Sequence, residues 1–184
     1  MVEVRQTGLP GVLELRPIRR GDERGFFSEV WSERELVAAG VSERFVQDNH
    51  SSSARGVLRG LHYQLAPVAQ AKLVRVSRGR VFDVAVDVRP ASPTFGRWYG
   101  ADLSAEDWNQ LFIPAGFAHG FLALEDGSEV QYKVTAPYSA PHDRGIDPFD
   151  PAIGIIWPLE REQVRLSPKD LAAACMSDAE LPGA

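Results

Sequence analysis

Three polar side chains lie on strand faces that are otherwise apolar. Lys72, Tyr132 and His119 each share a strand face with two valines or two phenylalanines, in stretches that alternate like β-strands. Because alternate residues of a strand point to the same side, these groups point toward apolar surroundings. A single residue of this kind is usually a satisfied core residue, but three together favour a polar pocket inside a β-rich fold.

His62 is the leading candidate for a catalytic base. It lies in the predicted strand Val57–Gln64, and histidine gains or loses a proton near neutral pH. Strict alternation places Arg59 on the opposite face of this strand. The two side chains can therefore reach one ligand only if Gly60 permits a β-bulge or if the strand ends there.

Two carboxylates, Asp83 and Asp87, also share a strand face. Such a pair could perform acid–base chemistry, but polar strand faces commonly meet solvent or a neighbouring arginine, and we favour that interpretation. The sequence has neither a phosphate-binding glycine loop nor a Gly-x-Ser-x-Gly nucleophile motif.

A metal site is considered because Pro114–His119 matches the second cupin motif, Pro-x-Gly-x-x-His. Metal-binding cupins also carry a His-x-His pair upstream, and this chain has His62-Tyr63-Gln64 there. The site would lack a ligand and hold a first-row metal poorly, so we expect no metal.

The elements that must position these residues are mainly strands. Short β-branched and aromatic runs alternate with turn signals, as in a sandwich or barrel, and Gly79 and Gly127 suit hairpin turns. The predicted strands are Val12–Ile18, Gly25–Trp31, Arg44–His50, Val57–Gln64, Lys72–Arg78, Arg80–Arg89, Arg97–Leu103, Asn109–Ile113, His119–Leu124 and Ser128–Thr135.

Two short helices have recognisable starts. Ser32 and Glu35 form the pattern of a capping box, and Gly40 suits the end of that helix. Ser167 is followed by a proline, a lysine and Asp170, which predicts a second capped helix running through residue 174. The proline-rich stretch 137–158 reads as a long irregular loop.

Composition limits the remaining possibilities. The 184 residues fit a single domain (1–184), and a net charge of -5 argues against a nucleic-acid surface. No apolar stretch approaches the roughly 20 residues of a membrane helix, and the start lacks the features of a secretory signal. One cysteine, Cys175, cannot form an internal disulfide, so we expect a cytoplasmic protein without membrane or nucleic-acid partners.

Several motifs together resemble one family, and they run almost from end to end of the chain. They are Gly21–Phe27, Gln47–Ser51, Leu58–Gln64, Gln70–Val74, Ser92–Gly96, Ile113–Phe121, Tyr132-Lys133 and Leu166–Asp170. In this order and spacing the sequence resembles the dTDP-4-dehydrorhamnose 3,5-epimerases. The resemblance implies an all-β cupin or jelly-roll sandwich with a few short helices, a homodimer, a dTDP-sugar substrate and no cofactor.

The resemblance implies four catalytic residues. His62 would accept a proton and be oriented by Asp170, while Tyr132 would donate a proton on the other face of the sugar. Loss of the proton at C3 or C5 beside the C4 ketone gives an enolate, and Lys72 suits stabilisation of its oxygen. The unperturbed pKa is about 10 for tyrosine and about 6.5 for histidine, which matches a donor and an acceptor at neutral pH.

The resemblance also implies substrate contacts. Arg59 would meet the diphosphate, Tyr138 would stack on the thymine, and Arg24 and Glu29 would come from the partner subunit. The full set is Arg24, Phe27, Glu29, Gln47, Asn49, Arg59, His119, Tyr138, Asp143 and Lys169.

Two positions depart from the family pattern. Asp143 stands where the family usually has a glutamate, and Pro148 stands where a tryptophan is common. The motifs do not separate epimerisation of both carbons from epimerisation of one, or thymidine from uridine. A non-catalytic sugar-nucleotide-binding protein and a metal-dependent cupin isomerase or oxygenase are further alternatives.

Overall fold

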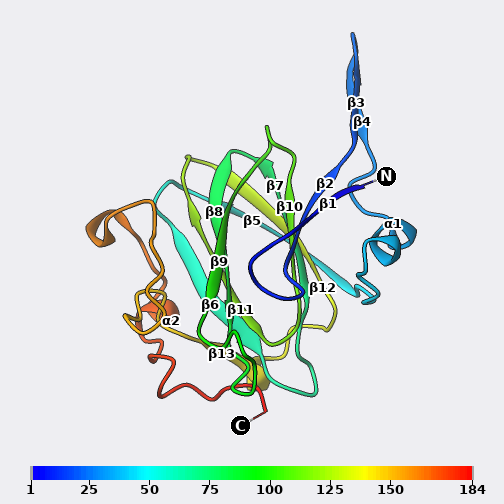
Figure 1. Cartoon of the computed structure of the whole chain (residues 1–184). Coiled ribbons are helices and arrows are strands. Elements are labelled where there is room, and N and C mark those ends of the chain that lie inside the picture. Colours follow the sequence, from blue (N-terminus) through cyan, green and yellow to red (C-terminus); the bar gives the residue numbers. More distant parts are fainter. Residues whose placement is uncertain (1, 184) are drawn as a thin grey trace.

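The computed structural model describes residues 2–183, and its main body is a sandwich of two sheets (Figure 1). The six-stranded sheet has the order β1-β2-β10-β7-β12-β5, and the five-stranded sheet has the order β13-β6-β11-β8-β9. All pairings between these strands are antiparallel. The expectation of a mainly β sandwich is confirmed.

The strands of the six-stranded sheet are β1 (Val2–Gln6), β2 (Leu13–Pro17), β10 (Gln110–Ile113), β7 (Lys72–Arg78), β12 (Ser128–Val134) and β5 (Gln47–Ser53). Those of the five-stranded sheet are β13 (Asp143–Gly145), β6 (Leu58–Gln64), β11 (Phe117–Ala123), β8 (Arg80–Asp87) and β9 (Trp98–Ser104). A separate hairpin consists of β3 (Arg19–Asp22) and β4 (Gly25–Ser28). The ten predicted strands are present with shifted ends, whereas β1, β3 and β13 were not predicted.

The core between the sheets follows from strand alternation. Val74, Val76 and Val130 of the six-stranded sheet pack with Phe117 and Phe121 of the five-stranded sheet, and all are nearly inaccessible. The turns between the strands are as predicted, since Gly79 has φ +71° and Gly127 has φ +67°. Toward one end of the sandwich, polar side chains replace this apolar packing.

The outer face of the five-stranded sheet is covered by the C-terminal part of the chain, drawn orange to red in Figure 1. Val84 and Val86 pack there with Ile153, Trp157 and Met176. The predicted irregular stretch does lie here, but it also contributes β13 and a 3₁₀ turn, η1 (Ala140–His142). A second such turn, η2 (Arg161–Gln163), follows. Both faces of this sheet are therefore buried.

The outer face of the six-stranded sheet carries α1 (Glu33–Ala38), whose Leu36 packs against Leu15 and Leu73. Ser32 is the N-cap by position, but its side chain makes no capping bond, so the predicted capping box is wrong. Gly40 has φ +90° and ends the helix as expected.

The second helix, α2 (Pro168–Leu171), is capped as predicted, because the Ser167 hydroxyl accepts from the Asp170 amide at 3.1 Å. It ends at Leu171, earlier than the predicted residue 174. Within residues 2–183, no helix is long and apolar enough to cross a membrane.

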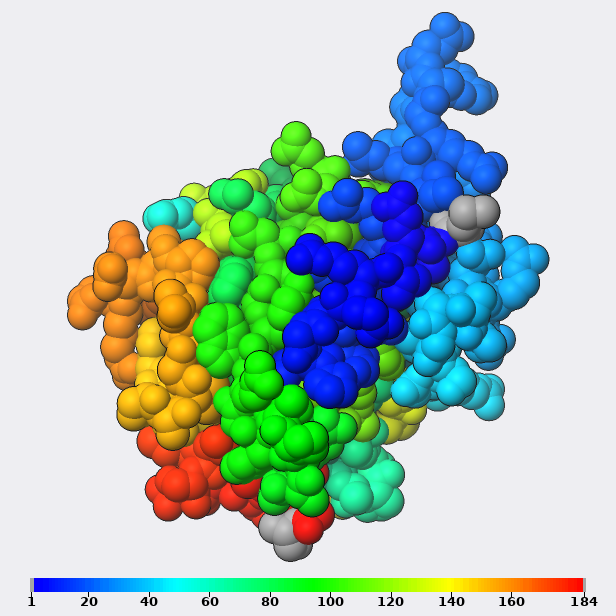
Figure 2. All heavy atoms as spheres, in the orientation of Figure 1, coloured from blue at the N-terminus to red at the C-terminus, as the bar shows by residue number. Residues whose placement is uncertain are grey.

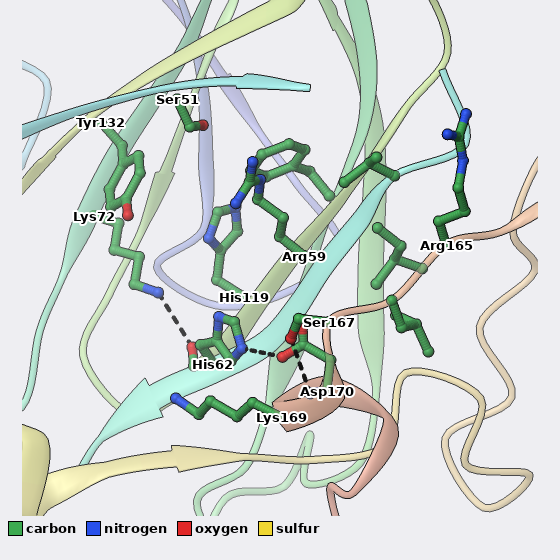
Figure 3. A pocket seen from close by; sticks show the side chains of 14 residues that line it. Ser51, Arg59, His62, Lys72, His119, Tyr132, Arg165, Ser167, Lys169 and Asp170 are labelled. Atoms are coloured by element: carbon green, nitrogen blue, oxygen red, sulfur yellow. Dashed lines mark hydrogen bonds and ion pairs between the residues drawn. The ribbon is translucent and has the colours of Figure 1, made fainter. Parts of the chain in front are cut away.

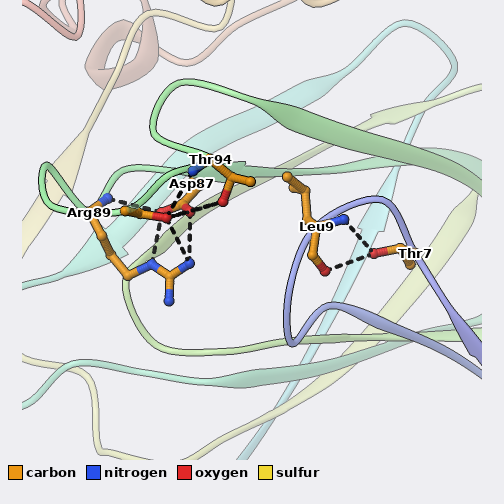
Figure 4. A network of polar contacts seen from close by, with 6 residues as sticks. Thr7, Leu9, Asp87, Arg89 and Thr94 are labelled. Carbon is orange, nitrogen blue, oxygen red and sulfur yellow. Dashed lines mark hydrogen bonds and ion pairs between the residues drawn. The ribbon is translucent and has the colours of Figure 1, made fainter.

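Asp87 organises the loop that follows β8 (Figure 4). Its buried carboxylate accepts from Arg89 at 2.7 Å and from Thr94 at 2.6 Å. Burial opposes ionisation, but hydrogen bonds from Arg89, Ser92 and Thr94 lower the pKa of Asp87 to about 2. Asp87 has the arginine partner that the sequence suggested, and it lies outside the pocket described below.

The β3–β4 hairpin projects from the body of the molecule (Figures 1 and 2). Phe27 on this hairpin is 73% exposed, and Phe26 contacts Trp108 edge-on with ring centroids 5.0 Å apart. Two adjacent exposed phenylalanines, Phe26 and Phe27, therefore place apolar surface on a projecting arm.

Candidate active site

A cavity of about 430 Å³ opens between the two sheets at the end where polar side chains replace the core (Figure 3). One wall comes from the six-stranded sheet, the other from the five-stranded sheet, and the rim from the segment before and within α2. The polar residues that line it are Ser51, Arg59, His62, Lys72, His119, Tyr132, Arg165, Ser167, Lys169 and Asp170. The four predicted catalytic residues thus lie in one cavity.

A β-bulge at Gly60 brings Arg59 and His62 to the same cavity. Where β6 pairs with β11, His62 faces His119, yet Arg59 faces Phe121, so β6 has one residue more than its partner. Gly60 has φ +131°, and a Cβ there would lie 2.5 Å from the Cα of Gly120. The extra residue reverses the alternation, which resolves the question that the sequence left open.

His62 forms a hydrogen-bonded pair with Asp170. Its Nε2 lies 2.6 Å from the Asp170 carboxylate, which is 4% exposed. Burial opposes ionisation of Asp170, but the hydrogen bond and charge of His62, the Ser167 hydroxyl and the Gly60 amide together lower its pKa below the usual value. The pairing fixes the ring orientation and leaves Nδ1 as the nitrogen available to a substrate.

Lys72 is held inside the cavity. It is 6% exposed, and its Nζ donates to the backbone oxygen of His62 at 3.1 Å. Burial lowers the pKa of Lys72 to about 8, against the opposing effect of Asp83 and Asp143. The ammonium form therefore predominates at neutral pH, close to the backbone of the candidate base.

His119 pairs with Asp83, and both side chains are buried. Nε2 of His119 donates to the two carboxylate oxygens of Asp83 at 3.0 and 2.9 Å. Burial lowers the pKa of His119 even though Asp83 raises it. The expectation that Asp83 meets solvent or an arginine is wrong, because this carboxylate is fully buried and pairs with His119. Its charge raises the pKa of both His119 and Lys72, against the effect of burial.

Tyr132 lies on the wall opposite His62. It belongs to β12 of the six-stranded sheet, whereas His62 belongs to β6 of the five-stranded sheet. Burial raises the pKa of Tyr132, with Arg59 opposing the shift. The phenol is therefore protonated at neutral pH and can act as a donor. Figure 3 shows its hydroxyl directed toward Lys72.

Four predicted substrate contacts do not line the cavity but form a hydrogen-bonded cluster that reaches it through Lys169. They are Gln47, Asn49, Tyr138 and Asp143. Gln47 donates to Asn49 at 2.8 Å and accepts from the Tyr138 amide at 3.1 Å. Asp143 accepts from the Tyr138 hydroxyl at 3.1 Å and forms an ion pair with Lys169. The Tyr138 side chain is 61% exposed, so its ring has an open face beside a polar cluster.

Three further predicted site residues lie neither in the lining of this cavity nor in that cluster. Arg24 and Phe27 belong to the projecting hairpin, Glu29 follows it, and none of the three lines the cavity. Arg24 instead pairs with Asp22 of its own hairpin. Their predicted contribution across a dimer interface stays a prediction.

Comparison with known proteins places this geometry in a family. A family model described as dTDP-4-dehydrorhamnose 3,5-epimerase matches residues 6–178. The chain belongs to this epimerase family. A relative from Shigella flexneri with the same description is 51% identical over 180 residues, covering 97% of this chain and 98% of the relative. One from Salmonella typhimurium is 50% identical over 184 residues, covering 98% and 99%.

Solved structures of the family agree in fold. The Legionella pneumophila dTDP-6-deoxy-D-glucose-3,5-epimerase, in complex with dTDP-4-keto-L-rhamnose, aligns with a TM-score of 0.94 at 46% identity, covering 99% of this chain and 98% of that one. A 3'-monoepimerase from Streptomyces bikiniensis, in complex with dTDP-quinovose, aligns with a TM-score of 0.89 at 34% identity, covering 96% and 91%. The cupin-type sandwich expected from the motifs is confirmed.

Sequence reasoning missed four polar residues in or next to this cavity. Ser51, Arg165 and Ser167 line the cavity, and Asp83 lies behind His119. Ser51 could have been predicted, because it shares a strand face with Asn49 in the motif Gln47–Ser51. Ser167 was read only as a helix cap, and no pattern in the sequence indicated Arg165.

Proposed function

We propose that this chain is a dTDP-4-dehydrorhamnose 3,5-epimerase that converts dTDP-4-dehydro-6-deoxy-D-glucose to dTDP-4-dehydro-L-rhamnose. The observation that carries the proposal is the arrangement of proton-transfer groups on two facing walls. His62 is held by Asp170 on one wall, and Lys72 and Tyr132 lie on the other. The family membership of the chain supports the same reaction.

In the first step, Nδ1 of His62 removes the proton from C3 or C5. The electron pair of that C–H bond forms the C=C bond of an enolate, and the negative charge gathers on the C4 oxygen. The Lys72 ammonium, shielded from water, would donate to this oxygen. A preorganised donor of this kind contributes a factor of about 100 to 1,000 in rate.

In the second step, Tyr132 delivers its proton to the same carbon from the opposite face, and the configuration inverts. The tyrosinate then takes a proton from solvent, while His62 releases the proton it gained, so the enzyme returns to its starting state. Positioned proton transfer contributes a factor of about 100 to 10,000. His119, held by Asp83, would orient the sugar between these groups.

The proposed nucleotide site lies at the edge of the cavity. Arg59 would bind the diphosphate, and Lys169 would add positive charge that an acidic chain otherwise lacks. Tyr138 would stack on the base, with Gln47 and Asn49 beside it. Asp143 and Lys169 are paired in this structure. When the ligand binds, Lys169 would therefore either leave Asp143 or contact Asp143 and the ligand together.

We further propose a homodimer in which the β3–β4 hairpin reaches the partner's cavity. Two observations support that arrangement: Phe27 is exposed, and Arg24 and Glu29 are not among the residues that line this subunit's own cavity. Sedimentation equilibrium tests it, and a monomer at micromolar concentration would contradict it. The cytoplasm is the proposed location, to be tested by cell fractionation.

Proton NMR of the reaction in deuterated water tests the activity. We expect deuterium at both C3 and C5 with inversion at both, loss of this activity in His62→Ala, and no loss in His50→Ala. His50 is a suitable control because its side chain is half-exposed and pairs with Glu129 outside the cavity.

Each other outcome of this experiment has a distinct meaning. Exchange at one carbon would identify a single-carbon epimerase. Binding without exchange would identify a sugar-nucleotide-binding protein, and activity lost to a chelator and restored by one metal would identify a metal-dependent enzyme.

A further inference from the structure

Ser51 has an unusual environment for a buried hydroxyl. Among residues 2–183, its Oγ is the only buried side-chain oxygen or nitrogen without a hydrogen-bond partner. Such groups are rare in folded proteins, and each exception calls for a physical reason. Ser51 also lines the active-site cavity, so a ligand there could supply the missing partner.

The neighbours of Ser51 along β5 already have partners. Gln47 and Asn49 bond to each other at the nucleotide edge, and the Ser53 hydroxyl accepts from Nε of Arg59 at 3.1 Å. Ser51 lies between these two pairs on the same strand face. It therefore stands between the proposed nucleotide contacts and the proposed diphosphate contact.

Two alternative partners within the protein are disfavoured by the geometry. Val130 is the residue that pairs directly with Ser51 across the strands, and its side chain offers no polar atom. The Tyr132 hydroxyl is directed toward Lys72 and away from Ser51 (Figure 3). The buried hydroxyl of Ser51 thus has no protein acceptor in reach, in a residue that lines the cavity.

We infer that Ser51 is a substrate-binding residue whose hydroxyl donates to the phosphate joined to the sugar, beside Arg59. This inference depends on the proposed function for the identity of the ligand. A phosphate oxygen is a strong acceptor, and a hydroxyl donor to a charged acceptor forms one of the stronger hydrogen bonds in proteins. The position beside Tyr132, which faces the sugar, assigns the contact to the phosphate joined to the sugar.

Calorimetric titration with dTDP and with dTMP tests the assignment, since dTMP lacks the second phosphate. Ser51→Ala should weaken dTDP binding by about tenfold and leave dTMP binding unchanged. Ser51→Cys keeps the side-chain volume but has a poor donor, so it should weaken dTDP binding as well. Ser52→Ala is the matched control, because the exposed Ser52 side chain lies on the other strand face.

Turnover separates binding from chemistry. In Ser51→Ala we expect a raised KM for the dTDP-sugar and a kcat close to that of the wild type. Equal dTDP affinity in the wild type and Ser51→Ala would overturn the inference, and so would an equal loss of dTMP affinity. A fall in kcat with unchanged dTDP binding would also overturn the inference, because it would indicate that Ser51 contacts the sugar and not the phosphate. If the wild type itself fails to bind dTDP, the proposed function fails instead.

Discussion

Replacement of Lys72 by methionine tests whether the buried ammonium group lowers the stability of the fold while it supports catalysis. Burial lowers the pKa of Lys72 from the ordinary 10.5 to about 8, which corresponds to a cost of about 3 kcal/mol when the buried amine is charged. Methionine has a similar length and no charge. The substitution removes the hydrogen bond from Lys72 to the His62 backbone oxygen, and this loss costs about 1 kcal/mol. We therefore expect Lys72→Met to be more stable than the wild type by about 2 kcal/mol at pH 7.

The size of this stability difference depends on pH in a defined way. Well below pH 8 the amine is charged in both the folded and unfolded states, and the full cost is present. Well above the ordinary pKa of 10.5 the amine is neutral in both states, and the cost disappears. Urea unfolding of the wild type and Lys72→Met from pH 7 to 10.5 should show the advantage of the variant shrinking as pH rises.

Catalysis should move in the opposite direction. Loss of the enolate donor should lower kcat/KM by a factor of about 100 to 1,000, measured by deuterium incorporation. The wild-type rate should also fall above pH 8, where Lys72 loses its charge. Lys133→Met, at an ammonium outside the cavity, is the control and should keep both activity and pH profile. A less stable, fully active Lys72→Met variant would refute the reasoning.

Three further predictions concern residues that position the catalytic groups or adjust their pKa values. Asp170→Asn should lower kcat by a factor of about 100 to 10,000 with little change in KM, and a loss below tenfold in steady-state kinetics would contradict its role. Gly60→Ala should destabilise the fold by about 2 kcal/mol in urea unfolding, whereas Gly8→Ala, where a Cβ meets nothing within 4 Å, should change stability little. Asp83→Asn removes a charge that raises the pKa of Lys72, so the alkaline fall in rate should begin at lower pH, and an unmoved profile would count against this coupling.

Strand alternation predicted the central part of the site because it depends only on local geometry. Lys72, His119 and Tyr132 face the interior of the sandwich, as their apolar neighbours indicated. The sequence indicated a bulge at Gly60 only as one condition under which Arg59 and His62 could reach the same ligand. Whether it forms depends on the close approach of Gly60 to Gly120, which lies on another strand.

Asp83 shows where local reasoning fails. A polar residue that alternates with valines normally indicates a solvent-exposed face, yet both faces of β8 are covered. One face meets the other sheet, and Val84 and Val86 on the other face lie under the C-terminal segment. That segment has no regular pattern, so its position over β8 depends on tertiary packing that sequence periodicity does not encode.

The sandwich itself explains why this fold suits inversion at carbon. Epimerisation needs a base and an acid on opposite faces of one sugar ring, and side chains on a single sheet would approach it from one side only. Here His62 and His119 extend from the five-stranded sheet, whereas Lys72 and Tyr132 extend from the six-stranded sheet. The separation of the proposed acid and base is therefore set by the spacing of two packed sheets, which the apolar core fixes. A loosened core should consequently impair inversion more than it impairs hydrogen exchange with solvent at the face of His62. Exchange requires only the base on one wall, whereas inversion requires the groups on both walls.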